Sequence, residues 1–183
     1  ALIKFAQTHQ IDLTFVGPEV PLAAGIVDDF QAIGLPIFGV TQKLAQLESS
    51  KTFAKAFMHR HHLPTAASKT VHSAIEAHAE ATLMGLPLVL KKDGLAAGKG
   101  VVIANDAATL DDTIEQFYAG HPDATVLLEE YLAGEEASVM ALFNDQRRVI
   151  LPLSQDHKRR HAADRGPNTG GMGAISPLPQ FKP

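Results

Sequence analysis

Short apolar runs and helically spaced apolar positions alternate along most of the 183-residue chain. Residues 11–16 and 36–39 are apolar runs that predict strands, and the apolar positions between them predict a helix over residues 22–32. A strand, a helix and a strand joined by short turns form a βαβ unit, which carries ligands at the carboxyl ends of its strands. Glu19 follows the first strand at that edge, either as a binding residue or as a solvated acid in a turn.

The next part of the chain predicts a helical pair and a small α+β module. Residues 41–62 have a helical pattern that restarts near Ser49-Ser50, because serine is a favoured helix N-cap. Pro64 marks a boundary, and the pattern that follows has the size of a module that is marginal alone and can move as a lid. Its predicted elements are a strand at 66–71, a helix at 73–84, strands at 88–90 and 101–103, a helix at 107–118 capped by Asp106, and a strand at 125–129.

Two more strands are predicted at residues 137–143 and 147–153, after which regular patterning stops. Residues 154–179 are predicted to be a long loop, and such a stretch inside a compact domain is usually functional or disordered. It contains a basic run at 157–160 and a glycine-rich run at 166–173. Both would suit a phosphorylated substrate, through charge-assisted contacts and backbone donors.

The loop that joins the two middle strands of the module carries the strongest chemical signal. Its glycines and lysines are Lys91, Gly94, Gly98, Lys99 and Gly100. Glycine lets backbone N–H groups turn toward one point and lysine adds positive charge, so this loop predicts a cover for phosphates. A Walker A loop is excluded, because three residues instead of four separate Gly94 from Gly98 and because Gly100 replaces the Ser or Thr. A glycine-rich hairpin without a ligand is the alternative.

Charged residues outside this loop also suggest binding. Lys51 lies in the first turn of a predicted helix, where lysine is unfavourable, so its side chain either reaches solvent or meets an anion. Glu129 and Glu130 end a predicted strand, and Glu136 follows after a turn. Acids in this position can bind the exocyclic amine of a purine and the hydroxyls of a ribose, and an ordinary charged hairpin is the alternative.

The composition narrows the classes of function. With 45% hydrophobic residues the chain can bury a core, and without cysteine it can have no disulfide, thiolate metal site or cysteine nucleophile. The lack of cysteine favours a reducing compartment, so we predict a cytoplasmic location. No apolar run approaches the roughly 20 residues that span a bilayer, and no signal-peptide layout is present. The formal charge of −4 argues against a nucleic-acid partner.

Six motifs occur in one order over essentially the entire chain: Val16-Gly-Pro-Glu19, Gln46-Leu-Glu-Ser-Ser-Lys-Thr-Phe53, Asp93-Gly-Leu-Ala-Ala-Gly-Lys-Gly100, Glu129-Glu-Tyr-Leu-Ala-Gly-Glu-Glu-Ala-Ser138, Gln155-Asp-His-Lys-Arg159 and Gly166-Pro-Asn-Thr-Gly-Gly-Met-Gly173. In these motifs the chain resembles the glycinamide ribonucleotide synthetase (phosphoribosylamine–glycine ligase) family. The resemblance implies an α/β chain with the ATP-grasp fold, an α+β lid and the tail of an N-terminal βαβ substrate domain. The implied domains are the substrate-domain tail at 1–45, the large ATP-grasp part at 46–63 and 126–183, and the lid at 64–125.

The resemblance implies an ATP-driven ligase of purine biosynthesis that joins glycine to 5-phosphoribosylamine through a glycyl phosphate. Lys51 and Lys91 would neutralise the ATP phosphates as catalytic residues, and the loop of residues 94–100 would close over them. The other implied contacts are Glu129 with the backbone of Glu130, Tyr131 and Leu132 for adenine, Glu136 for ribose, and Glu19, Asp156, Lys158, Asn168, Thr169 and Gly170 for phosphoribosylamine and glycine. The intact enzyme is expected to be a monomer.

The chain departs from the family's usual pattern in two ways. Single positions differ at Val40, Ser49, Lys92 and Ala162, and none of them removes an ATP-binding lysine or acid. Family members also begin with a glycine-rich strand before the first position of this chain and continue beyond Pro183. The Glu and Asn that hold magnesium lie in that continuation, so no metal ligand is predicted in this chain and we expect little turnover from these 183 residues alone.

Two other functions fit parts of the pattern. A non-catalytic ATP-binding module of the ATP-grasp class would not need the magnesium ligands, but it would also not need the elaborate segment 154–179. Another ATP-grasp ligase, such as a carboxylase subunit, would share the nucleotide site. The runs that begin at Asp156 and Gly166 argue against the carboxylase, because they match the glycinamide ribonucleotide synthetase family specifically.

Overall fold

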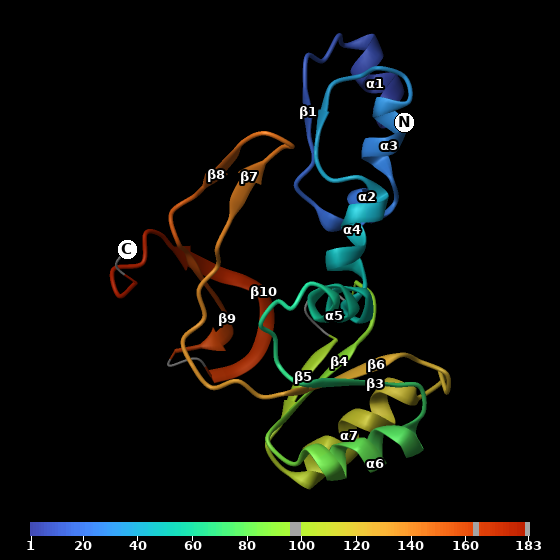
Figure 1. Ribbon diagram of the computed structural model, residues 1–183, viewed down its shortest axis with the longest axis vertical. Coiled ribbons are helices and arrows are strands. Elements are labelled where there is room, and N and C mark those ends of the chain that lie inside the picture. The colour runs from blue at the N-terminus through green and yellow to red at the C-terminus, as the bar shows by residue number, and fades with distance from the viewer. Residues whose placement is uncertain (96–99, 163–164, 182–183) are drawn as a thin grey trace. The chain divides into compact units, whose positions relative to one another are not determined.

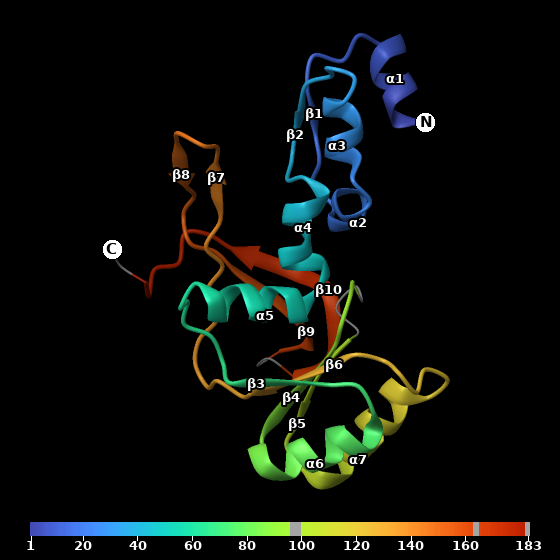
Figure 2. The same cartoon turned by 45° about the vertical axis from the view of Figure 1, so that its right-hand side comes forward.

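The computed structural model describes residues 1–95, 100–162 and 165–181 (Figures 1 and 2). The described chain falls into two compact units, one that runs up to Tyr131 and one that begins at Leu132. The finer division of the first unit at residues 45, 63 and 125 stays a prediction. Within the described residues, no helix is both long and apolar enough to cross a membrane.

The first unit opens with the predicted βαβ arrangement. Its elements are α1 (Leu2–Thr8), β1 (Thr14–Phe15), α2 (Glu19–Ala23), α3 (Ile26–Gln31) and β2 (Ile37–Phe38). The strands β1 and β2 pair in parallel, and Val27 and Phe30 of α3 are buried. The single helix predicted over residues 22–32 is wrong, since Gly25 has a φ of +85° and separates α2 from α3. A left-handed backbone at this glycine cannot continue a right-handed helix.

Two helices follow, α4 (Gln42–Ser49) and α5 (Lys51–Arg60). Ser50 stands between them in an extended conformation, and its hydroxyl accepts a hydrogen bond of 3.1 Å from the amide of Phe53. This serine satisfies one of the free N–H groups at the start of α5. The predicted helix restart at Ser49-Ser50 is therefore confirmed.

A four-stranded antiparallel sheet forms the centre of the first unit. In chain order its elements are β3 (Ser68–Val71), α6 (Ala74–Met84), β4 (Leu88–Lys92), β5 (Val101–Ala104), α7 (Ala107–Tyr118) and β6 (Val126–Glu130), and the strand order is β3-β6-β4-β5. Asp106 caps α7 as predicted, since its carboxylate accepts a 2.8 Å hydrogen bond from the amide of Thr109. The strands predicted on either side of the glycine loop are confirmed, because β4 and β5 pair directly.

The two faces of this sheet differ in character. Leu88, Leu90 and Leu128 are buried in a core with α6 and α7, and Figures 1 and 2 show these helices on one side of the sheet and α5 on the other. Successive strand residues point to opposite faces. Lys91 and Glu129 therefore lie on the face away from α6 and α7, in neighbouring strands whose register pairs Val89 with Glu129.

The second unit contains two antiparallel strand pairs, β7 (Ala141–Phe143) with β8 (Arg148–Ile150) and β9 (Gln155–His161) with β10 (Arg165–Ile175). The strands predicted at 137–143 and 147–153 are present in shortened form. The long loop predicted over 154–179 is wrong, because β9 and β10 lie within it. Most of their described residues are exposed, so neither strand has the apolar alternation that marks a half-buried strand, and the pairing is irregular on both sides of Asn168.

Candidate functional site

Asp93, the first residue after β4, attaches the start of the glycine loop to the N-terminus of α5. One carboxylate oxygen accepts hydrogen bonds from the amides of Lys51 (2.6 Å) and Thr52 (3.3 Å), and the other accepts from the hydroxyls of Thr52 (2.9 Å) and Ser50 (3.2 Å). A carboxylate in this position also complements the positive end of the helix dipole. The anion at the start of α5 is thus supplied by the chain itself.

The side chain of Lys51 reaches the same loop from the helix. Its ammonium group donates a 2.7 Å hydrogen bond to the carbonyl oxygen of Gly94. Gly94 has a φ of +92°, a left-handed conformation that glycine adopts without strain, and open space surrounds the position where a Cβ would stand. Lys51 and the beginning of the loop are therefore held together through both the backbone and the side chain of Lys51.

The hydrogen bonds to Asp93 have a consequence for pH. Burial raises the pKa of this carboxyl, but hydrogen bonds from Thr52 and from the backbone of Lys51, Thr52 and Gly94 outweigh burial and bring the pKa below the ordinary 3.8. Because the pKa of Asp93 is lower in the folded than in the unfolded chain, its ionised carboxylate stabilises the fold at pH values above the unfolded-state pKa. This stabilisation is lost as the pH falls through the pKa that Asp93 has in the folded chain.

We expect Asp93→Asn to lower the thermal unfolding midpoint by a few degrees near neutral pH, because the amide cannot accept all these hydrogen bonds as an anion does. The difference from the wild type should shrink as the pH falls below 3.8 and the wild-type carboxyl becomes protonated. Thermal unfolding followed by circular dichroism between about pH 2.5 and pH 7 measures this. The exposed Asp112→Asn is the control, and a difference at Asp93 that persists unchanged into acid would contradict the prediction.

A second cluster of charges lies on the sheet face that carries Lys91. The carboxylate of Glu129 forms two ion pairs. One of its oxygens lies 2.7 Å from the ammonium nitrogen of Lys91, and the other lies 3.4 Å from that of Lys55 in α5. Lys55 also donates to the hydroxyl of Thr65 (2.6 Å) and to the carbonyl oxygen of Ala66 (2.9 Å). The side chains of Lys55 and Glu129 are 8% and 10% exposed, while that of Lys91 is 27% exposed. Lys91 thus has the most exposed side chain of the cluster.

Lys55 was not predicted as a site residue. It follows Lys51 by one helical turn in a stretch of mainly apolar residues, and residues four apart share one helix face. A lysine on the inner face of an amphipathic helix is a signal for a buried ion pair, because lysine is almost never buried without a partner. The sequence alone does not name that partner.

The remaining predicted residues of the first unit have less distinctive environments. Glu130 is exposed, and its carboxylate accepts a 3.3 Å hydrogen bond from the amide of Ala67. Tyr131 is 40% exposed, and Gly100 is buried just before β5. Glu19 is the first residue of α2 and is exposed. Gly98 and Lys99 lie outside the described residues.

The second unit brings several predicted substrate residues together. The ammonium of Lys158 lies 3.2 Å from a carboxylate oxygen of Asp156 and 3.9 Å from one of Glu136. Thr169, on the facing strand β10, donates a 2.9 Å hydrogen bond to the carbonyl oxygen of Lys158. The neighbouring predicted residues are Asn168, whose backbone pairs with Arg159, and the exposed Gly170, while Leu132 is exposed at the start of the unit. Lys158 of β9 therefore lies beside two acids, Asp156 of the same strand and Glu136 from the segment before β7.

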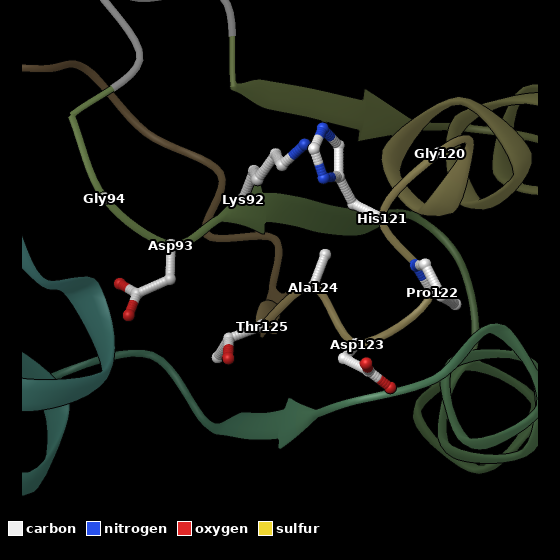
Figure 3. Close-up of a pocket in the computed structure, with 9 residues that line it drawn as sticks. All are labelled: Lys92, Asp93, Gly94, Gly120, His121, Pro122, Asp123, Ala124 and Thr125. Carbon is white, nitrogen blue, oxygen red and sulfur yellow. The ribbon is translucent and has the colours of Figure 1, made fainter.

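A wide, open depression of about 670 Å³ lies beside the beginning of the loop (Figure 3). The residues that line it are Lys92, Asp93, Gly94, Gly120, His121, Pro122, Asp123, Ala124 and Thr125. Figure 3 shows the carboxylates of Asp93 and Asp123 directed to a different side from Lys92 and His121. These polar side chains do not converge on one point, so the depression has no arrangement of groups that marks a ligand site.

The described residues contain no group of three or more His, Cys, Asp or Glu side chains that could hold a metal ion. Magnesium usually takes only one or two protein carboxylates together with substrate phosphates, so the expectation that its protein ligands lie beyond Pro183 stays a prediction.

The comparisons with known proteins agree with this architecture. The N domain of phosphoribosylglycinamide synthetase matches residues 1–48, and the ATP-grasp (A) domain of the same family matches residues 49–183. A phosphoribosylamine–glycine ligase from Ralstonia nicotianae is 53% identical over 100% of this chain and 44% of the relative, and one from Halalkalibacterium halodurans is 50% identical over 98% of this chain and 43% of the relative.

A solved structure supports the same relationship. The crystal structure of a phosphoribosylamine–glycine ligase from Thermotoga maritima matches with a TM-score of 0.71 and 37% identity, over 83% of this chain and 40% of that chain. The chain spans 44% of the length of the Ralstonia relative. Both family models together cover the chain from its first residue to its last. The chain therefore belongs to the phosphoribosylglycinamide synthetase family, and it has the ATP-grasp fold.

Proposed function

We propose that this chain supplies the nucleotide site and part of the substrate site of a phosphoribosylamine–glycine ligase. The reaction joins glycine to 5-phosphoribosylamine and converts ATP to ADP and phosphate. The observation that supports this most directly is the pair of lysines at the glycine loop. Lys51 donates a hydrogen bond to the carbonyl oxygen of Gly94. Lys91, two residues before Asp93, has the most exposed side chain of the cluster around Glu129.

In this proposal Lys51 and Lys91 neutralise the phosphates of ATP. A glycine-rich sequence such as that of residues 94–100 can direct backbone N–H groups to one point, so it would supply donors to the same phosphates. Catalysis of phosphoryl transfer depends mainly on such positioning and charge neutralisation. The cluster around Glu129 contains two ammonium groups and one carboxylate, 2 − 1 = +1, so positive charge remains available to a phosphate.

The adenosine part is assigned to the end of β6 and the residues after it. The carboxylate of Glu129 accepts one hydrogen bond from Lys91 and forms an ion pair with Lys55, and a carboxylate has about four acceptor positions, so it can still accept the exocyclic amine of adenine. The backbone of Glu130 to Leu132 would complete the contacts to the base. Glu136, whose side chain is 79% exposed, would accept the ribose hydroxyls.

The substrate contacts are assigned to Glu19, Asp156, Lys158 and the turn of residues 168–170. A carboxylate oxygen of glycine attacks the γ-phosphorus of ATP, and ADP leaves with the electrons of the broken P–O bond. The amine of phosphoribosylamine then attacks the acyl carbon of glycyl phosphate, phosphate leaves, and the amine loses a proton. Lys158, whose ammonium lies 3.2 Å from Asp156, would form a charge-assisted contact with the phosphate of the ribose. We further propose that the intact enzyme is a cytoplasmic monomer.

Calorimetric titration of the 183-residue chain with ATP and with GTP tests the nucleotide assignment. We expect ATP to bind at least about tenfold more tightly than GTP, because the purine 6-oxo group of GTP cannot donate to the acceptors at the end of β6 and leaves them unpaired. Glu136→Ala should weaken ATP binding and leave the binding of inorganic triphosphate unchanged. A chain that unfolds cooperatively but binds no ATP, with or without magnesium, would contradict the proposal.

A further inference from the structure

Lys55 is a buried charge that the proposed contacts to ATP and substrates do not use. Its side chain is 8% exposed, and three oxygens surround its ammonium group: Thr65 Oγ1, Ala66 O and Glu129 Oε1. Two of its three N–H donors form the hydrogen bonds to Thr65 and Ala66, and the ammonium forms an ion pair with Glu129. Lys55 is therefore too buried to bind a phosphate of its own.

The contribution of Lys55 is to the charge of Glu129. Without it, Glu129 and Lys91 would form a pair with a net charge of zero, 1 − 1 = 0, and Lys91 would be the only ammonium at the carboxylate. With Lys55 present the cluster keeps a charge of +1, 2 − 1 = +1. A ligand would meet this net positive charge at Lys91, because the side chain of Lys91 is the most exposed of the three.

Lys55 lies on the helix that contacts both parts of the proposed phosphate site, the start of the glycine loop and the Glu129–Lys91 pair. It lies on α5 one turn after Lys51, whose amide binds Asp93 and whose ammonium binds Gly94. A single helix therefore contacts the loop at its first turn and the Glu129–Lys91 pair at its second. Buried groups of this kind hold a site in one geometry by satisfying its charges.

We propose that Lys55 is a positioning residue, which neutralises Glu129 from the buried side and so leaves Lys91 free to bind a phosphate of the nucleotide. This inference rests on the proposed nucleotide site. Lys55 contacts no ligand, and it acts through Glu129.

Lys55→Met tests the proposal, because methionine keeps an unbranched apolar stem and removes the charge. Inorganic triphosphate is the probe, since it contacts the phosphate site without the adenine contacts of Glu129. We expect its dissociation constant to rise about tenfold in Lys55→Met, the effect of weakening one charge-assisted contact. The same change at Lys43, an exposed lysine of α4, should leave it within about twofold.

The variant Lys55→Met/Glu129→Gln separates positioning from general damage to the fold. Glutamine is neutral and forms no ion pair with Lys91, so triphosphate affinity should return to within about threefold of the wild-type value. A merely structural role of Lys55 predicts no such rescue. The proposal is overturned if Lys55→Met binds triphosphate as the wild type does, or if the double variant binds no better than Lys55→Met.

If the wild type binds neither triphosphate nor ATP, the proposed nucleotide site is wrong. Urea unfolding then tests separately whether Lys55 compensates the charge of Glu129. We then expect the unfolding midpoint of the double variant to lie above that of Lys55→Met, because the second change removes a carboxylate that has lost its buried partner. Additive effects of the two substitutions would show that Lys55 does not compensate Glu129.

Discussion

Lys91→Met is expected to weaken ATP binding by about a hundredfold, the largest effect on ligand binding that we predict for a single substitution. Lys91 is the accessible ammonium of the Glu129 cluster, and its loss changes the charge of the cluster from +1 to zero. The phosphates would then meet a neutral site in which a carboxylate is still present. Calorimetric titration of the wild type and the variant with ATP measures the loss.

The neighbouring residue supplies the control for this prediction. Lys92 follows Lys91 in β4, so its side chain points to the opposite face of the sheet, and Lys92→Met changes the net charge by the same amount. We expect Lys92→Met to keep ATP affinity within about threefold of the wild type, because a partly exposed charge outside the site acts only weakly. Equal losses in both variants would show that the effect comes from net charge and not from the position of Lys91.

Glu129→Ala is expected to lower the free energy of unfolding by about 3 kcal/mol or more, the largest effect on stability that we predict. The substitution removes the only carboxylate within ion-pair distance of Lys55 among the described residues, and the side chain of Lys55 is 8% exposed. An ammonium group that is buried without a compensating charge is costly, because water no longer solvates it. Urea unfolding followed by circular dichroism measures the change.

The adjacent Glu130→Ala is the matched control. Glu130 is exposed, and its carboxylate accepts a single 3.3 Å hydrogen bond from the amide of Ala67, so we expect a loss of less than about 1 kcal/mol. Both substitutions remove one acid from the end of β6. The explanation by a buried ion pair fails if Glu129→Ala destabilises the chain no more than Glu130→Ala does.

Local sequence patterns predicted the first unit well, because each signal acts over a few residues. Ser50 and Asp106 accept hydrogen bonds from helix amides three residues ahead, and this short-range geometry can be read from residue type and position. The glycine loop returns as a strand, which apolar runs on both sides predicted. The break at Gly25 was missed, because the apolar spacing is continuous across it.

The pairing of β9 with β10 could not be predicted from hydrophobic periodicity. Periodicity arises when one face of a strand is buried, and most described residues of this pair are exposed. Its glycines also hide the pattern, since Gly171 and Gly173 adopt positive φ values of +129° and +152° at an irregular part of the ladder. Such irregularities shift the side-chain alternation on which a strand prediction depends.

The sequence by itself determined the chemical types at the site and the elements that carry them. It placed Lys51 at a helix start, Lys91 at a strand end before a glycine loop, and Glu129 at the end of another strand, because helix caps and apolar runs at these positions act over only a few residues. The tertiary structure alone decided which charges meet. Asp93 binds the start of α5, and Glu129 stands between Lys55 and Lys91. These pairings depend on packing between segments far apart in the chain, where burial removes water and makes each charge require a specific partner.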